Sequence, residues 1–275
     1  MTWRQRITIS VGLLACASPG SQAHAALFGV QPYTDRIVEI DPATGTITRS
    51  IPSPDPYPKG GLSGIDHGRW LLYQSATGNN TSGNLCWLDP LTGEIAQSAS
   101  YYLPDTFPGG LTAQNYGDHQ IITLGGKGEL AFWHHPNPLA QVPTLSSFEE
   151  RWIVRGALGG DGFGRAFAFC VDDWESNSYA IVEFDPSGES FEPIHIMPFS
   201  RLVGGLAFDG QFLYAASYDD LLTLDPETSE ILNTVSVPDG FLSALAVAVP
   251  EPGSLGVLLL LLPATVVRRP RVWRN

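Results

Sequence analysis

The fold of this chain is decided by residues 205–238, which read GLAFDGQFLYAASYDDLLTLDPETSEILNTVSVP. Short apolar stretches in this segment are separated by turn-forming pairs, among them Asp209-Gly210 and Asp225-Pro226. We therefore expect four antiparallel strands here, of which the first is built mainly from small residues. Small residues suit the innermost strand of a propeller blade, because that strand crowds around a central channel.

Both parts of this unit recur along the chain, as in a repeat protein. Turns of the Asp-Pro type begin at Asp41, Asp89, Asp185 and Asp225, and a degenerate turn contains His135. Strands of small residues recur at 61–66, 110–113, 156–159 and 205–210. The period is about 45 residues, a normal length for a blade of four short strands. The sequence therefore predicts an all-β fold, a β-propeller over residues 26–248. Five four-stranded blades fit best; residues 138–155 fit worst, and six blades are the alternative.

The two ends of the propeller domain are expected to pair with each other. Residues 26–30 have the character of a second strand, so the first blade begins without its inner strand. Residues 240–247 have the character of an inner strand and would supply it, which closes the ring and leaves no open edge. Residues 205–238 also resemble blades of YVTN-type and quinoprotein-like propellers, with Tyr214-Ala215-Ala216-Ser217 at the place of the YVTN tetrapeptide. That resemblance implies a fold and no particular activity.

Residues 249–275 carry the most specific motif. Val249-Pro250-Glu251-Pro252 is followed by an uncharged apolar run over 253–267 and then by a cluster of arginines: Arg268, Arg269, Arg271 and Arg274. Prolines break regular structure, and an apolar helix followed by cations is held at the inner face of a membrane. The run is shorter than the roughly 20 residues of a stable span, which favours a transient anchor. An ordinary single-span tail anchor is the alternative.

This order of elements resembles the PEP-CTERM sorting signal of Gram-negative bacteria. The resemblance implies that an exosortase cuts near Pro250, Glu251 and Pro252, and that Arg268, Arg269 and Arg271 hold the helix until then. It further implies transient anchoring in the inner membrane and delivery to the cell surface or to an extracellular, exopolysaccharide-containing matrix.

The N-terminal residues predict export through the Sec translocon. A basic start (Arg4 and Arg6), an apolar stretch over 7–17 and the small residues around position 24 indicate a signal peptide, 1–25, cleaved between Ala25 and Ala26. Residues 13–16 also fit a lipoprotein box loosely, but the apolar core would then be very short. We favour plain signal cleavage.

The charge of the propeller domain excludes one class of partner. The chain has 15 basic and 28 acidic residues; without 1–25 and 249–275, 9 and 27 remain, a net charge of −18. Such a surface repels phosphate backbones, so we expect no nucleic acid partner. No cofactor is evident, although a divalent cation such as calcium is compatible with the charge. Cys86 and Cys170 fall on non-adjacent blades, and we expect buried thiols rather than a disulfide.

Candidate ligand-binding residues gather on one face of the predicted ring. Loops that join the second and third strands of a blade share this face with the connections between blades. They contain acidic, amide and aromatic residues that would form a rim: Tyr33, Asp35, Asn80, Asp172, Asp173, Trp174, Tyr218 and Asp219. Aromatic rings there would stack on a sugar and carboxylates would bind a cation. The same residue types are also common in exposed turns that have only a structural role.

The sequence contains no catalytic motif of the Gly-x-Ser-x-Gly, P-loop or Cys-x-x-Cys type. We therefore expect a non-catalytic binding or structural component of the surface matrix, with exopolysaccharide as the candidate ligand. The alternative is an extracellular hydrolase or lyase that acts on a polysaccharide or a lactone through the acidic face. It would need carboxylates that converge from different blades, because Asp172 and Asp173 are neighbours on one strand and point in opposite directions.

Overall fold

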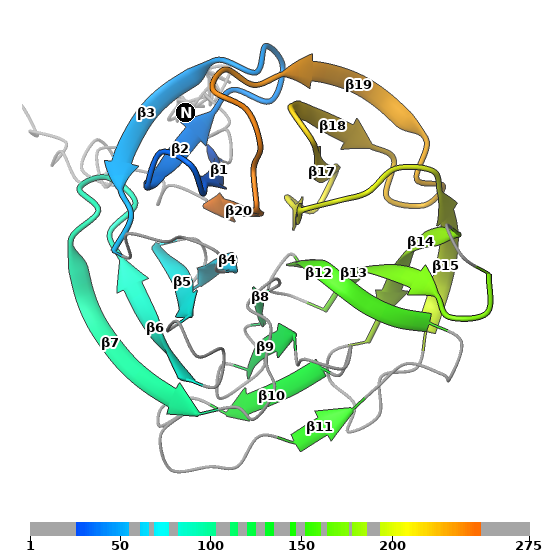
Figure 1. Cartoon of the computed structure of the whole chain (residues 1–275), viewed down its shortest axis with the longest axis horizontal. Coiled ribbons are helices and arrows are strands. Elements are labelled where there is room, and N and C mark those ends of the chain that lie inside the picture. Colours follow the sequence, from blue (N-terminus) through cyan, green and yellow to red (C-terminus); the bar gives the residue numbers. More distant parts are fainter. Residues whose placement is uncertain are drawn as a thin grey trace, which may run out of the picture.

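The computed structural model is all-β, and its sheets are arranged around a common centre (Figure 1). The structure describes residues 26–54, 61–65, 69–76, 82–102, 111–114, 120–124, 130–134, 144–146, 152–160, 164–175, 178–185 and 193–248. Side chains are described for these ranges except 75–76, 82–83, 101–102 and 111–146.

The strands that the structure describes pair into five antiparallel four-stranded sheets, which we number in chain order. Sheet 1 contains β20 (Ala244–Ala248), β1 (Ala26–Gln31), β2 (Arg36–Ile40) and β3 (Ile47–Pro52). Sheet 2 contains β4 (Leu62–Ile65), β5 (Trp70–Ala76), β6 (Ser82–Leu88) and β7 (Ile95–Tyr102). Sheet 3 contains β8 (Leu111–Gln114), β9 (Gln120–Leu124), β10 (Leu130–His134) and β11 (Thr144–Ser146). Sheet 4 contains β12 (Trp152–Gly160), β13 (Ala166–Asp172), β14 (Tyr179–Phe184) and β15 (Pro193–Phe199). Sheet 5 contains β16 (Gly205–Phe208), β17 (Leu213–Ser217), β18 (Asp220–Leu224) and β19 (Ile231–Ser236).

The prediction of an all-β propeller is confirmed. Strands β20, β4, β8, β12 and β16 lie nearest the centre, and β3, β7, β11, β15 and β19 form the outer edge (Figure 1). The closure is as predicted, because β20 pairs antiparallel with β1 from Ala26 opposite Ala248 to Val30 opposite Ala244. The inner strand begins at Ala244, later than the expected 240, because residues 237–243 make the connection from β19 to β20.

The small residues of the inner strands are required by close packing of neighbouring backbones. A Cβ atom added to Gly205 of β16 would lie 2.7 Å from backbone atoms of Ala244 and Leu245 in β20. A Cβ added to Gly159 of β12 would lie 2.9 Å from the backbone nitrogen of Ala207 in β16. Three consecutive inner strands therefore touch through their backbones, and larger side chains at these positions would push the sheets apart.

The core lies between neighbouring sheets. One buried cluster joins Phe167 and Phe169 of sheet 4 to Leu206, Phe208 and other apolar residues of sheet 5. The rings of Phe167 and Phe208 meet edge to face, with centroids 5.0 Å apart. Two further described clusters join sheet 1 to sheet 2 and sheet 5 to sheet 1 in the same way.

Both cysteines of the propeller domain are buried thiols, as predicted. Burial raises the pKa of the Cys170 thiol, because the thiolate would lose its hydration. The thiol therefore stays protonated at physiological pH and behaves as a small apolar group.

The described Asp-Pro turns, those of sheets 1, 2 and 5, each lie against the preceding sheet of the ring. The Asp41 carboxylate accepts a hydrogen bond from the backbone N–H of Ala43 at 2.9 Å, and Asp89 and Asp225 organise their turns in the same way. The fifth residue of each turn has a positive φ: +74° at Gly45, +74° at Gly93 and +56° at Ser229.

These fifth residues are the points of contact between sheets. A Cβ on Gly45 would lie 2.3 Å from the carbonyl oxygen of Ser236 in sheet 5, and one on Gly93 would lie 3.1 Å from Ile51 Cβ in sheet 1. At Ser229 the hydroxyl instead donates a hydrogen bond to the Pro198 carbonyl of sheet 4 at 3.1 Å. The motif that marks the repeat in the sequence therefore also holds the repeats together.

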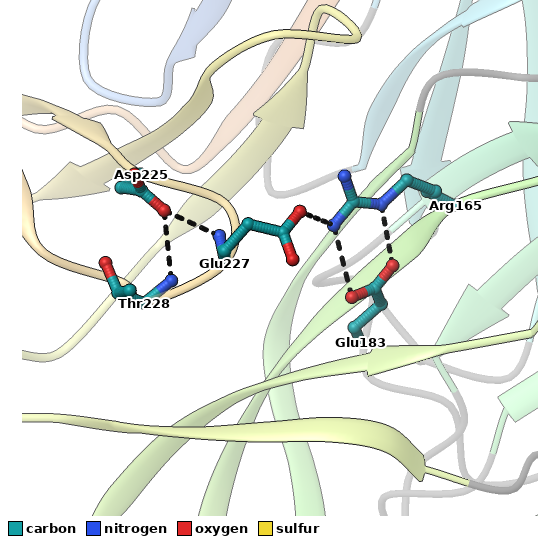
Figure 2. A network of polar contacts seen from close by, with 5 residues as sticks. All are labelled: Arg165, Glu183, Asp225, Glu227 and Thr228. Atoms are coloured by element: carbon teal, nitrogen blue, oxygen red, sulfur yellow. Dashed lines mark hydrogen bonds and ion pairs between the residues drawn. The ribbon is translucent and has the colours of Figure 1, made fainter.

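A cluster of ionised side chains adds a further link between sheets 4 and 5 (Figure 2). Arg165 donates to both carboxylate oxygens of Glu183, at 2.6 and 3.2 Å, and lies 2.9 Å from a carboxylate oxygen of Glu227. Its guanidinium also lies 5.2 Å from the centroid of the Phe167 ring and 5.1 Å from that of Phe208. The hydrogen bond with Glu183 is the main reason that the pKa of Arg165 is raised.

Candidate ligand-binding face

One end of the ring is formed by hairpin loops and by the connections between sheets; we call it the loop face. Its described parts are the β1–β2 loop (32–35), the β13–β14 loop (173–175 and 178), the β17–β18 loop (218–219) and the connections 200–204 and 237–243. Backbone hydrogen bonds fix both connections: the Gly204 N–H donates to the Ala216 carbonyl of β17 at 2.8 Å, and the Val237 N–H donates to the Asp219 carbonyl of the β17–β18 loop at 2.9 Å.

Three aromatic side chains stand out from this face. Tyr33 is 84% exposed, Trp174 is 69% exposed and Tyr218 is 65% exposed. They belong to equivalent hairpin loops of sheets 1, 4 and 5, and they are the exposed aromatic residues among the side chains that the structure describes. Large rings left in water on one face are typical of surfaces that bind a partner or a ligand.

The backbone holds two of these loops in strained conformations. Asp35 and Tyr218 both have φ of +53°, a left-handed conformation that costs a non-glycine residue about 1–2 kcal/mol. The β17–β18 turn has only two residues, since Ser217 pairs directly with Asp220. Strain of this kind persists where surrounding contacts fix the chain, so the position of the Tyr218 ring is determined by the hairpin.

A buried glutamine supports the loop that carries Tyr33. Gln31 is the last residue of β1 and is 2% exposed. Its side-chain amide donates to the Pro238 carbonyl at 3.0 Å, and its oxygen accepts a hydrogen bond from the Thr34 hydroxyl at 3.2 Å. Its role as a link between the β1–β2 loop and the β19–β20 connection depends on ring closure.

The two aspartates predicted beside Trp174 have different environments. Asp172 is 2% exposed, and its carboxylate accepts hydrogen bonds from the backbone N–H groups of Trp174 at 2.9 Å and Glu175 at 3.3 Å. Asp173 is exposed. Asp172 therefore stabilises the loop from beneath, and Asp173 is the member of the pair that a ligand could reach.

The loops of sheets 1 and 5 meet at the β19–β20 connection. The rings of Tyr33 and Phe241 have centroids 6.5 Å apart and are tilted by 54°. A Cβ on Gly240 would lie 3.4 Å from the Asp219 carboxylate. Asp219, from sheet 5, therefore lies next to the connection, as Tyr33 does from sheet 1. We call the following group the seam patch: Tyr33, Tyr218, Asp219, Asp239 and Phe241.

Phe241 was not predicted as a site residue. The sequence assigned it to the closing strand, whereas it lies three residues before β20. The preceding Pro238-Asp239-Gly240 is turn-forming, and Asp239 and Gly240 both have positive φ, at +63° and +87°. From the sequence alone, this turn could have indicated that residues 240–243 belong to the connection and that the strand begins later.

Acidic groups outnumber basic ones on the described loops and connections of this face. The acidic residues are Asp35, Asp173, Glu175, Asp219 and Asp239, and the basic residue is Arg201. Arg201 is already engaged, at 3.3 Å from the Asp220 carboxylate. Within the described residues, no three His, Cys, Asp or Glu side chains come together to hold a metal ion, so calcium binding stays a prediction.

Several predicted site residues fall outside the described part of the chain: Ala25, Asn80, Pro250, Glu251, Pro252, Arg268, Arg269 and Arg271. Ala26, on the other side of the predicted signal cleavage, is the first residue of β1. In the ranges described, no helix has both the length and the apolar character needed to cross a membrane.

Comparisons with known proteins assign this chain to no family. No family model matches the chain, and no curated protein does. Among solved structures, the chain is similar to the crystal structure of Citrobacter koseri AztD, with 15% identity and a TM-score of 0.36. The match covers 69% of this chain and 49% of AztD, so the chain spans about half the length of that protein. A similarity this distant carries no argument about function.

Proposed function

We propose that this protein is an exported, five-bladed propeller that is sorted to the cell surface or extracellular matrix and binds extracellular polysaccharide without catalysis. The observation that carries the proposal is the shared position of Tyr33, Trp174 and Tyr218 on the loop face. An exposed ring offers a flat apolar surface against the C–H face of a sugar, and the nearby polar groups can hydrogen-bond its hydroxyls. Rings on separate sheets suit successive units of a long polymer rather than one small molecule.

The proposed address rests on the resemblance of residues 249–275 to a PEP-CTERM signal and of residues 1–25 to a signal peptide. In this proposal, the pairing of Ala26 with Ala248 determines how the domain would be oriented while it is anchored, because both residues lie at the end of sheet 1 opposite the Tyr33 loop. Attachment through residue 248 would therefore turn the loop face away from the membrane and towards extracellular polymer.

A hydrolase or lyase is less well supported. Such chemistry needs carboxylates that converge on one bond. On the described part of the loop face, Asp172 is occupied by backbone N–H groups and Asp220 by Arg201. We therefore put binding forward as the function of this face.

Polysaccharide binding can be tested with the full-length chain, purified in detergent, on an array of matrix polymers. The variant Tyr33→Ala/Trp174→Ala/Tyr218→Ala should lose about tenfold or more in affinity for any polymer that the wild type retains. A matched control is Leu91→Ala/Ile194→Ala/Leu232→Ala, which removes exposed apolar side chains away from the loop face. Equal losses in both variants, or no polymer retained by the wild type, would refute the proposal.

The address can be tested by the intact mass of the surface form in the native host. We expect a protein of about residues 26–250, and replacement of Pro250-Glu251-Pro252 by alanines should block its release. Neutral residues in place of Arg268, Arg269, Arg271 and Arg274 should also block release, through loss of the anchor. A surface protein that still carries residues 258–274 would show that the C-terminal segment is a permanent anchor.

A further inference from the structure

The seam patch combines aromatic rings and carboxylates from two sheets and from the connection between them. Tyr33 comes from sheet 1, and Tyr218 and Asp219 come from sheet 5. Between them lie Phe241, in contact with Tyr33, and Gly240, beside Asp219. The patch is therefore assembled by the closure of the ring, and hydrogen bonds from Gln31 to Pro238 and from Val237 to Asp219 hold its parts together.

The carboxylates of the patch are not used within the described structure. Asp219 and Asp239 are both exposed, and neither is in an ion pair with a described residue. Asp220, the next residue in the chain, is by contrast paired with Arg201. The patch thus contains two exposed carboxylates and two exposed tyrosine rings, in a domain whose net charge is −18.

This combination selects for a positive charge on the ligand. An ammonium group is attracted both to a carboxylate and to the negative face of an aromatic ring. A uronic acid or sulfated sugar would be repelled by the same groups, and a neutral sugar would gain only the contact with the rings.

We propose that the seam patch binds a sugar unit with a free, protonated amino group, so that the polymer recognised by this protein is a partly or fully deacetylated amino-sugar polysaccharide. The inference rests on the proposed function, since it names the chemical class of the polymer bound at the loop face. Tyr33 and Tyr218 stack on the sugar rings, and Asp219 and Asp239 bind the ammonium groups.

The test compares three probes of equal length on the full-length chain: a β-1,4-linked glucosamine oligomer, its fully N-acetylated form and an oligouronate. Binding is measured at mildly acidic pH, where the amines carry their protons, and at low and high salt. The wild type should bind the glucosamine oligomer about tenfold more tightly than the acetylated form and should not bind the oligouronate. The preference should shrink as salt is added.

Two variants separate the local site from the general acidity of the protein. Asp219→Asn/Asp239→Asn keeps the side-chain shape, and asparagine tolerates the positive φ of residue 239. It should lose the preference for the amine while it keeps its affinity for the acetylated oligomer. The control Glu94→Gln/Glu230→Gln removes the same charge from exposed Asp-Pro turns at the opposite end of the sheets and should retain the preference. If the double asparagine variant unfolds at a lower temperature, Asp239→Asn alone serves as the test variant.

The outcomes distinguish this inference from the proposed function. Equal binding of the glucosamine oligomer and its acetylated form, or equal losses in the asparagine and glutamine variants, would overturn the amino-sugar site and leave polysaccharide binding intact. Tight binding of the oligouronate would also overturn the amino-sugar site and leave polysaccharide binding intact. Failure of every probe and of every array polymer to bind would overturn both.

Discussion

Substitution of Gly45 by alanine tests whether the Asp-Pro turns hold neighbouring sheets together. Gly45 has φ of +74°, and an added Cβ would lie 2.3 Å from the Ser236 carbonyl oxygen and 3.3 Å from Val235 Cβ in β19. Gly210 provides a matched control, because its φ is +91° and an added Cβ would meet nothing within 4 Å. The two substitutions therefore share the backbone strain and differ in the contact between sheets.

The expected magnitudes follow from these two contributions. A left-handed conformation costs alanine about 1–2 kcal/mol, and this cost applies to both variants. At Gly45 the turn must also move away from β19, and overpacking of this kind costs about 1–3 kcal/mol more. Gly45→Ala should therefore lower the free energy of unfolding by about 2–5 kcal/mol, against about 1–2 kcal/mol for Gly210→Ala. Gly93→Ala should fall between them, because its Cβ would lie 3.1 Å from Ile51 Cβ, a milder overlap than the 2.3 Å approach to a carbonyl oxygen at Gly45.

Urea unfolding of the full-length chain, followed by circular dichroism, measures these differences. The order Gly45, Gly93, Gly210 from most to least destabilised would support docking of sheets through the turns. Equal losses at Gly45 and Gly210 would refute it, since backbone strain alone would then account for both. An unchanged m-value across the series is needed for the comparison, because it shows that the same surface is exposed on unfolding.

Two further predictions concern ionisable groups. Arg165→Met should lower the free energy of unfolding by about 2–4 kcal/mol, because it leaves the largely buried Glu183 carboxylate without its cation. Glu227→Gln removes the exposed member of the cluster and should cost less than about 1 kcal/mol; comparable losses in urea unfolding would argue against this account. Burial and the neighbouring Asp209 raise the pKa of Tyr214, so the folded state holds this proton more tightly than the unfolded state does. Stability should therefore be intact below about pH 10, the ordinary tyrosine value, and fall as the pH rises above it. Tyr214→Phe should flatten this alkaline fall in a pH series of thermal unfolding, and a profile identical to that of the wild type would contradict the assignment.

The candidate face has some features that local sequence patterns predict and others that they do not. The loops that carry Tyr33, Trp174 and Tyr218 were predictable, because turn residues between alternating strands locate hairpins and the repeat locates equivalent hairpins on one side. The burial of Asp172 was not, since adjacent acidic residues look alike in the sequence and differ only in which one lies beneath the loop. The contact of Phe241 with Tyr33 joins residues about 200 positions apart, and no local pattern encodes it.

The sequence by itself determined the propeller class, the repeat and the closing role of the residues before Ala248. These follow from short-range physics: Asp-Pro turns, alternation of apolar residues and small side chains at crowded strands. Only the tertiary structure decided which turn lies against which sheet, that Arg165 joins Glu183 to Glu227, and that rings and carboxylates meet at the seam patch. Such contacts arise from the curvature with which successive sheets pack into a ring. That curvature depends on close contacts such as those of Gly159 and Gly205 with the next strand, which no single stretch of sequence contains.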